Sequence, residues 1–215
     1  MAQLFPKHFN TLAKASILGG LLFLVLIGTG LYIWSRSVFS TQIGIAKDQP
    51  VPFSHKHHVE GLGIDCRYCH TAVEKSSFAG IPPTKTCMNC HSIIWNEAPM
   101  LAPVRESWKN KKPLEWNRVH NLADFVQFNH SAHIAKGVAC TTCHGQVNEM
   151  PLMWKERSLQ MQWCLSCHRE PEKFIGPKDK VFDPRWKAPD QAKMGHELVS
   201  EYNVKKLTNC SVCHR

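Results

Sequence analysis

The sequence lacks the signatures of several common enzyme classes. It contains no phosphate-binding loop, no nicotinamide-binding glycine fingerprint and no Ser-His-Asp order. Charged residues make up 20% and apolar residues 43% of the chain, which excludes a disordered polyelectrolyte and a membrane protein with several spans. The length of 215 residues allows one or two small domains and excludes a large enzyme.

The sequence also lacks an unpaired cysteine. Its 10 cysteines form five Cys-x-x-Cys pairs, and a histidine directly follows each pair. Because 13 of the 215 residues are histidine, chance gives this at one pair with a probability of about 0.06, and at all five on the order of one in a million. The five motifs are CRYCH (66–70), CMNCH (87–91), CTTCH (140–144), CLSCH (164–168) and CSVCH (210–214).

This spacing is typical of covalent haem attachment. Two thiols three residues apart can add to the two vinyl groups of one haem, and the adjacent histidine then binds the iron. Structural zinc sites and disulfide frameworks would use the thiols but leave the five histidines unexplained. We therefore predict five covalently bound haems c. The attachment residues are Cys66, Cys69, Cys87, Cys90, Cys140, Cys143, Cys164, Cys167, Cys210 and Cys213, and the proximal iron ligands are His70, His91, His144, His168 and His214.

One long apolar run lies near the amino end. Residues 15–34 carry no charge, and a helix of that length crosses a hydrocarbon core of about 30 Å. The run exceeds the usual signal-peptide core of roughly 7–15 residues, lacks an A-x-A cleavage site and ends in Tyr32 and Trp34, which suit a membrane interface. We expect a retained single-pass anchor in a bacterial inner membrane. Since c-type haem is attached outside the cytoplasm, residues 1–14 would be cytoplasmic and the haem domain periplasmic.

Segments 51–70 and 126–144 repeat one pattern, in which a Phe is followed by two histidines and then by a Cys pair. The repeat predicts two two-haem modules, 51–125 and 126–190, after a linker (35–50) and before a carboxyl-terminal helix with the fifth haem (191–215). A second imidazole on each iron would give a low-spin electron-transfer centre with no place for substrate. The predicted sixth ligands are His55, His58, His130 and His133. His57 is off the repeat's spacing and is expected at the surface, although the sequence leaves the choice between His57 and His58 open.

The repeat supplies four sixth ligands for five irons. For the fifth we prefer His120, which lies directly before the second module. Met153 is an alternative that would raise the potential of its haem, and the remaining alternatives are His196 or an open site. The sequence does not choose among them.

The predicted fold is a multihaem cytochrome c, with one amino-terminal transmembrane helix and a mostly irregular, short-helix periplasmic domain organised around the haems. Residues 170–189 are expected to form an irregular connection, and the porphyrins are expected to act as the apolar core. Two apolar stripes predict helices, namely Met100, Val104 and Trp108, and Met194, Leu198 and Tyr202.

The segments around the motifs identify a family more specifically than the CxxCH motifs, which occur in all c-type cytochromes. FSHKHH, GLGIDCRYCH, AGIPPTKTCMNCH, RVHNLADFVQFNHSAH, GVACTTCHGQVNEMPLMW, CLSCHR and CSVCHR together resemble the multihaem cytochrome c subunit of bacterial alternative complex III, over nearly the whole chain. The resemblance implies a complex that oxidises menaquinol and passes electrons towards a periplasmic carrier or an oxygen reductase. It also implies partners: an iron–sulfur subunit, integral membrane quinol-binding subunits and a monohaem cytochrome c.

A single-span multihaem quinol dehydrogenase that feeds a periplasmic reductase is the alternative function. No CxxCK motif occurs, which argues against reductase chemistry of the multihaem nitrite class. The formal charge of +9 does not indicate nucleic acid, because the propionates of five haems would offset it.

Overall fold

The structure is a computed structural model that describes residues 5–214. Residues 1–4 of the predicted cytoplasmic segment and Arg215 of the predicted carboxyl-terminal segment lie outside the described residues. The chain divides into two units, residues 1–42 and residues 43–215, which are described separately.

The first unit contains the long apolar helix α1 (Phe9–Arg36) and the short helix α2 (Val38–Thr41). Helix α1 has 28 residues, buries none of its side chains, and is the one helix within residues 5–214 that is long and apolar enough to cross a membrane. Ser37 ends it with an extended backbone and caps α2. Helix α1 thus extends beyond the predicted span (15–34) at both ends and includes the first two residues of the predicted linker (35–50). It is compatible with a single-pass anchor.

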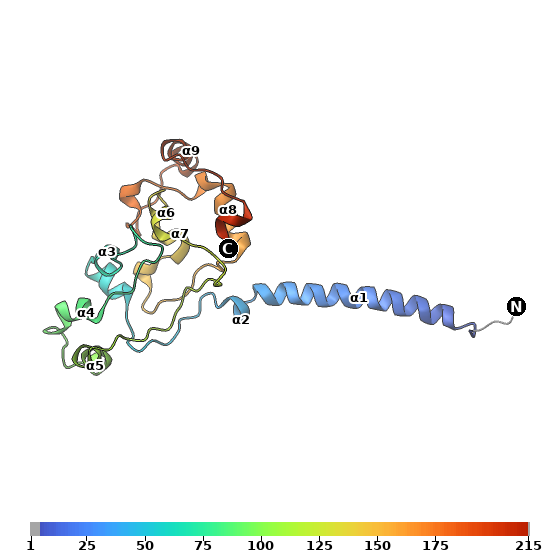
Figure 1. Cartoon of the computed structure of the whole chain (residues 1–215), viewed down its shortest axis with the longest axis horizontal. Coiled ribbons are helices and arrows are strands. Elements are labelled where there is room, and N and C mark those ends of the chain that lie inside the picture. The colour runs from blue at the N-terminus through green and yellow to red at the C-terminus, as the bar shows by residue number, and fades with distance from the viewer. Residues whose placement is uncertain (1–4, 215) are drawn as a thin grey trace. The chain divides into compact units, whose positions relative to one another are not determined.

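The second unit consists of short helical segments joined by long irregular connections (Figure 1). The longest helix, α9, has 11 residues, and within the described part of the chain strand pairing is limited to isolated bridges such as Val126–His214. The predicted short-helix architecture is confirmed. The elements are η1 (Lys56–Gly61), α3 (Cys66–Cys69), α4 (Thr84–His91), η2 (Pro99–Leu101), α5 (Ala102–Asn110), α6 (His130–Ile134), α7 (Cys140–His144), η3 (Val147–Glu149), α8 (Met161–Arg169), η4 (Pro171–Lys173), η5 (Lys178–Lys180), α9 (Gln191–Glu201) and α10 (Cys210–Cys213).

The side chains form a small apolar core. The buried hydrophobic residues of the described chain are Val51, Val73, Leu101, Val104, Met150, Ile175, Val181 and Leu198. A domain of this size ordinarily buries most of the apolar surface of its unfolded chain. Side chains alone therefore contribute little of the burial that such a domain needs, which agrees with the expectation that porphyrins supply the rest.

The predicted apolar stripe at residues 100–108 is wrong. Val104 is buried, but Met100 and Trp108 are 52% and 49% exposed, whereas Leu101 and Ser107 are buried. Pro99–Leu101 form a 3-10 turn with three residues per turn, and Leu101, three residues before Val104, is buried in place of Met100. Within α5 the inward face continues through Ser107, three residues after Val104, so Trp108 lies outside it. Leu101 and Val104 pack with Val51 on this shifted face.

The second predicted stripe, on α9, is confirmed. Leu198 is buried and Met194 and Tyr202 are half-buried on the same face. The helix packs against η4, and the Gln191 Nε2 donates hydrogen bonds to the carbonyl oxygens of Glu172 and Ile175, both at 2.9 Å. The segment predicted as an irregular connection therefore contains two short 3-10 turns, η4 and η5, and supports a helix.

Gly195 allows this close approach, and its replacement tests the packing. A Cβ at this position would overlap the carbonyl oxygen of Glu172, so Gly195→Ala has to separate α9 from η4. We expect the free energy of unfolding to fall by about 1–3 kcal/mol, although alanine favours helix by about 1 kcal/mol. Thermal unfolding followed by circular dichroism measures the change. The matched control is Ala192→Ser, at an exposed position of α9, and an equal loss in both variants would contradict the close-packing explanation.

Candidate haem sites

Each Cys-x-x-Cys pair lies on one helical turn. Helices α3, α7 and α10 begin at the first cysteine of their motif, and α4 and α8 contain their motifs near the carboxyl end. Because residues i and i+3 share a helix face, both thiols of a pair point to the same side. All ten cysteines are free of disulfide bonds in this structure.

The histidines also fit haem better than a zinc cluster. Within residues 5–214 no group of three or more His, Cys, Asp and Glu side chains converges as a metal cluster would. A haem iron takes its four equatorial ligands from the porphyrin and needs only two axial protein ligands.

Three pairs of histidine rings have the separation that such an iron requires. Metal–imidazole bonds are about 2 Å long, so an iron between two Nε2 atoms holds the ring centroids roughly 6 Å apart. Each pair joins a histidine of the repeat to a histidine of a Cys-x-x-Cys-His motif. The centroid distances are 6.2 Å for His58 and His91, 6.3 Å for His130 and His144, and 6.1 Å for His133 and His168.

Hydrogen bonds at Nδ1 orient these rings. A backbone carbonyl oxygen can only accept, so an Nδ1 that faces one carries the hydrogen and leaves the Nε2 lone pair free for iron. This holds for predicted sixth ligands and for predicted proximal ligands alike. The Nδ1 contacts are His58 to Ser54 O at 2.8 Å, His130 to Ser77 O at 2.8 Å, His133 to Asn129 O at 2.7 Å, His70 to Gly80 O at 2.6 Å and His91 to Ile94 O at 3.0 Å.

The sequence repeat is also a structural repeat. Phe53 packs edge-on against His55 and face-on against His58, at interplanar angles of 89° and 27°. Phe128 packs in the same way against the two histidines that follow it, at 88° and 28°. Each phenyl ring therefore fixes two imidazoles at once. This role of the Phe was missed in the sequence, although its equal spacing in both copies was the available signal.

His55 occupies the place in the first module that His130 occupies in the second. Its Nδ1 is buried without a hydrogen-bond partner. Burial, and after it the nearby His70 and His58, lower the pKa of His55 to about 4. By the repeat, His70 is the predicted partner of His55 across an iron, and a neutral imidazole is the form that binds a metal.

His57 is placed differently from its neighbour. Its ring is exposed and stacks on Trp95, with centroids 5.5 Å apart. The ring of His58 instead faces His91 and is oriented by Ser54. The geometry therefore favours His58 as the iron ligand.

The placement of His120 differs from its predicted role. Its Nε2 lies 3.2 Å from the Nδ1 of His144, and the ring centroids are 4.3 Å apart. The ring contact of His214 is with Phe125, at 5.7 Å. The preference for His120 at the fifth iron stays a prediction, and in this structure its Nε2 contacts another histidine. Nothing in the sequence indicated this pairing.

The structure does not decide between the other two candidate ligands of the fifth iron. Met153 is half-buried and His196 is exposed on α9, and both stay predictions.

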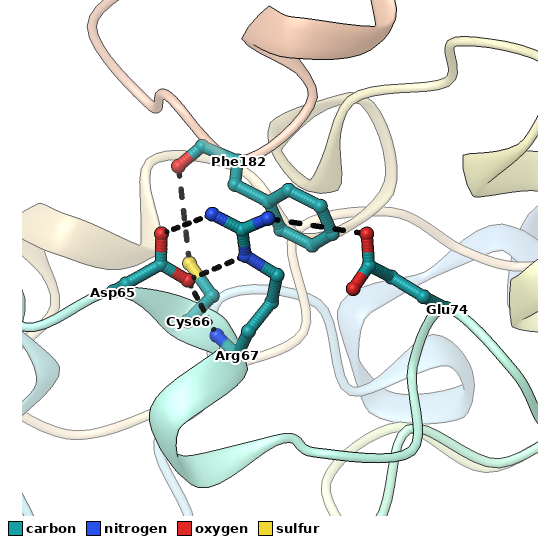
Figure 2. A network of polar contacts seen from close by, with 5 residues as sticks. All are labelled: Asp65, Cys66, Arg67, Glu74 and Phe182. Carbon is teal, nitrogen blue, oxygen red and sulfur yellow. Dashed lines mark hydrogen bonds and ion pairs between the residues drawn. The ribbon is translucent and has the colours of Figure 1, made fainter.

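The first site is held by a polar network (Figure 2). The Arg67 guanidinium, between the two cysteines of CRYCH, donates to Asp65 Oδ1 at 2.9 Å and Oδ2 at 2.8 Å, and lies 3.9 Å from Glu74. It also stacks 4.6 Å above the Phe182 ring. The hydrogen bonds from Arg67 lower the pKa of Asp65. The motif is thereby fixed against a segment more than a hundred residues away.

The sites follow one another in space in an order that differs from the sequence. Cys66 Sγ lies 4.0 Å from the carbonyl oxygen of Phe182, and the Cys140 backbone NH donates to Val181 O at 3.2 Å. The two thiols also hydrogen-bond each other, which raises the pKa of Cys140 in the polypeptide. The first and third sites are therefore neighbours.

The remaining sites extend this pair on both sides. Asn89 of the second site donates to the Tyr68 hydroxyl of the first site at 3.0 Å. Burial, followed by the proximity of Cys167 and Cys164, raises the pKa of Cys143 to about 12, which places the third site beside the fourth. Burial and then the proximity of Cys213 raise the pKa of Cys164, which places the fourth site beside the fifth. The spatial order is second, first, third, fourth, fifth.

Helical Cys-x-x-Cys turns and iron-spaced histidine pairs together define a multihaem cytochrome c. Comparison with known proteins agrees. Residues 126–215 match the family described as cytochrome c7 and related cytochrome c. The chain is also 38% identical over 181 residues to a protein named menaquinone reductase, multihaem cytochrome c subunit, from Nitratidesulfovibrio vulgaris. The aligned region covers 79% of this chain and 78% of that protein. The chain therefore belongs to the family of multihaem cytochrome c subunits that includes this relative, and it carries covalently bound haem c.

Adjacent histidines offer a matched test of the ligand assignment. His58→Ala removes a ring that faces His91, so we expect one haem to change from low spin to high spin, while His57→Ala leaves all haems low spin. Electron paramagnetic resonance of the oxidised full-length protein measures both. A high-spin haem in the His57 variant, with none in the His58 variant, would reverse the assignment.

Proposed function

We propose that the protein is the electron-conducting subunit of a membrane-bound, quinone-linked respiratory complex, with five c-type haems. The observation that carries the proposal is the set of histidine pairs at iron spacing. An iron with two imidazole ligands has no free position for a substrate and exchanges electrons without bond making. The ligands would be the five motif histidines and, across four of the irons, His55, His58, His130 and His133.

The quinone link is supported from two directions. The relative is named as a subunit of a menaquinone reductase, and the sequence resembles the corresponding subunit of alternative complex III. In that complex the partners would be an iron–sulfur subunit, integral membrane subunits that bind the quinol, and a monohaem cytochrome c. Helix α1 would anchor the subunit in the inner membrane, with the haems in the periplasm.

The route of electrons would follow the spatial order of the sites. The second and fifth sites are its two ends, and they contain the two exposed cysteines, Cys90 and Cys210. An exposed terminal site can meet a partner, whereas the first, third and fourth sites have neighbours on both sides. We infer that electrons enter and leave through the second and fifth haems.

We propose menaquinol as the electron donor. The name of the relative favours a second candidate, in which electrons flow in the reverse direction and menaquinone is reduced. The test uses the purified native complex under anaerobic conditions. If the donor is menaquinol, its addition reduces the haems within the turnover time of the complex, as followed at their visible absorption bands. The control supplies a reduced periplasmic cytochrome together with menaquinone.

The two directions predict opposite results for net turnover. Steady quinol oxidation with an oxidised acceptor supports the proposed direction, and steady quinone reduction in the control selects the reverse. A complex that performs neither reaction would contradict the quinone-linked function.

Carbon monoxide binding distinguishes an electron conduit from an enzyme, such as a single-span quinol dehydrogenase in which one haem iron has a free axial position. It binds ferrous iron that has a free axial position, so the reduced full-length protein is expected to show no change in its Soret band. The His58→Ala variant is the positive control and should bind carbon monoxide at one haem. Binding by the unaltered protein would count against a pure conduit.

A further inference from the structure

The proximal histidine of the third site has an unusual hydrogen-bond partner. The Nδ1 atoms of His70 and His91 face the backbone carbonyl oxygens of Gly80 and Ile94. The Nδ1 of His144 instead faces the side chain of His120, at 3.2 Å from its Nε2. The two rings meet at 72°, so the His144 nitrogen points towards the edge of the His120 ring.

The direction of this hydrogen bond follows from the ring on the other side of His144. His130 lies parallel to His144 at an iron-spaced 6.3 Å. An iron between them takes the Nε2 of His144, so the Nδ1 of His144 must carry the hydrogen and donate it. The Nε2 of His120 is then the acceptor, and its own hydrogen sits on Nδ1.

The residues directly before His120 form hydrogen bonds that hold this part of the chain in place. Asn117 exchanges hydrogen bonds with Gln49, with its NH donating to Gln49 Oε1 at 2.9 Å and its carbonyl accepting from Gln49 Nε2 at 2.9 Å. Lys47 donates to the carbonyl of Arg118 at 3.1 Å. The half-buried His120 is therefore positioned by the chain before it.

We propose that His120 is a positioning residue, which accepts a hydrogen bond from the proximal histidine of the third haem and lowers the reduction potential of that haem. This inference rests on the proposed ligation of an iron by His144. A proximal imidazole that donates a hydrogen bond is a stronger electron donor to its iron, which stabilises the ferric state. The third haem is central in the spatial order of the sites, so its potential bears on transfer in both directions.

The test is a potentiometric titration of the full-length, haem-loaded protein, with electron paramagnetic resonance to count low-spin haems. His120→Leu removes the acceptor, and we expect the midpoint potential of one haem to shift to a more positive value while every haem keeps its spin state. His120→Gln retains an acceptor oxygen and should restore most of the original value. The matched control, His57→Leu, changes an exposed histidine that stacks on Trp95 and should leave all potentials unchanged.

Three outcomes would overturn the proposal. An unchanged potential in His120→Leu would show that the contact does not act on the haem. A shift that His120→Gln does not reverse would assign the effect to packing. A new high-spin haem in His120→Leu would make His120 an iron ligand. Failure of the proposed function has a separate signature, because a protein that binds carbon monoxide before any substitution has at least one iron with an open axial position.

Discussion

A hydrogen bond at the outer nitrogen of the imidazole is the interaction on which most of the proposed haem ligands depend for their orientation. It decides which nitrogen is free for iron and turns the ring about its own axis. In the described sites the acceptor is mostly a backbone carbonyl, as at Ser54, Asn129, Ser77 and Gly80. The course of the irregular chain thus orients the imidazole rings. The loops place specific carbonyl oxygens next to the Nδ1 atoms of the histidines.

The domain has little regular structure, and its irregular course agrees with this use of the backbone. Regular helices and strands use their carbonyl groups internally, whereas five carbonyls here accept from imidazoles. The side-chain core is small, and Met150 and Ile175 are its most completely buried large members. Cofactors that are bonded to the chain can replace side-chain packing as the source of apolar burial. Folding and haem attachment are therefore expected to be coupled.

The sequence predicted the chemistry of the sites better than their surroundings. Motif spacing and the internal repeat depend on local covalent geometry, so the helical turns at the cysteines and the paired roles of His58 and His133 could be read directly. The face of α5 could not, because the buried residues Leu101, Val104 and Ser107 follow one another in steps of three, whereas the apolar pattern suggested steps of four. The position of His120 could not be read either, since it depends on Asn117 meeting Gln49 across a long separation in sequence. Contacts between distant segments carry no periodic signal.

The shared phenyl ring has a consequence for how each module works as a unit. Phe53 and Phe128 each contact two histidines that are proposed ligands of two different irons. The separation of the two proposed metals in a module would thus be held by about six residues of backbone and one aromatic ring. Electron transfer within a module would then take place over a distance that short-range contacts fix.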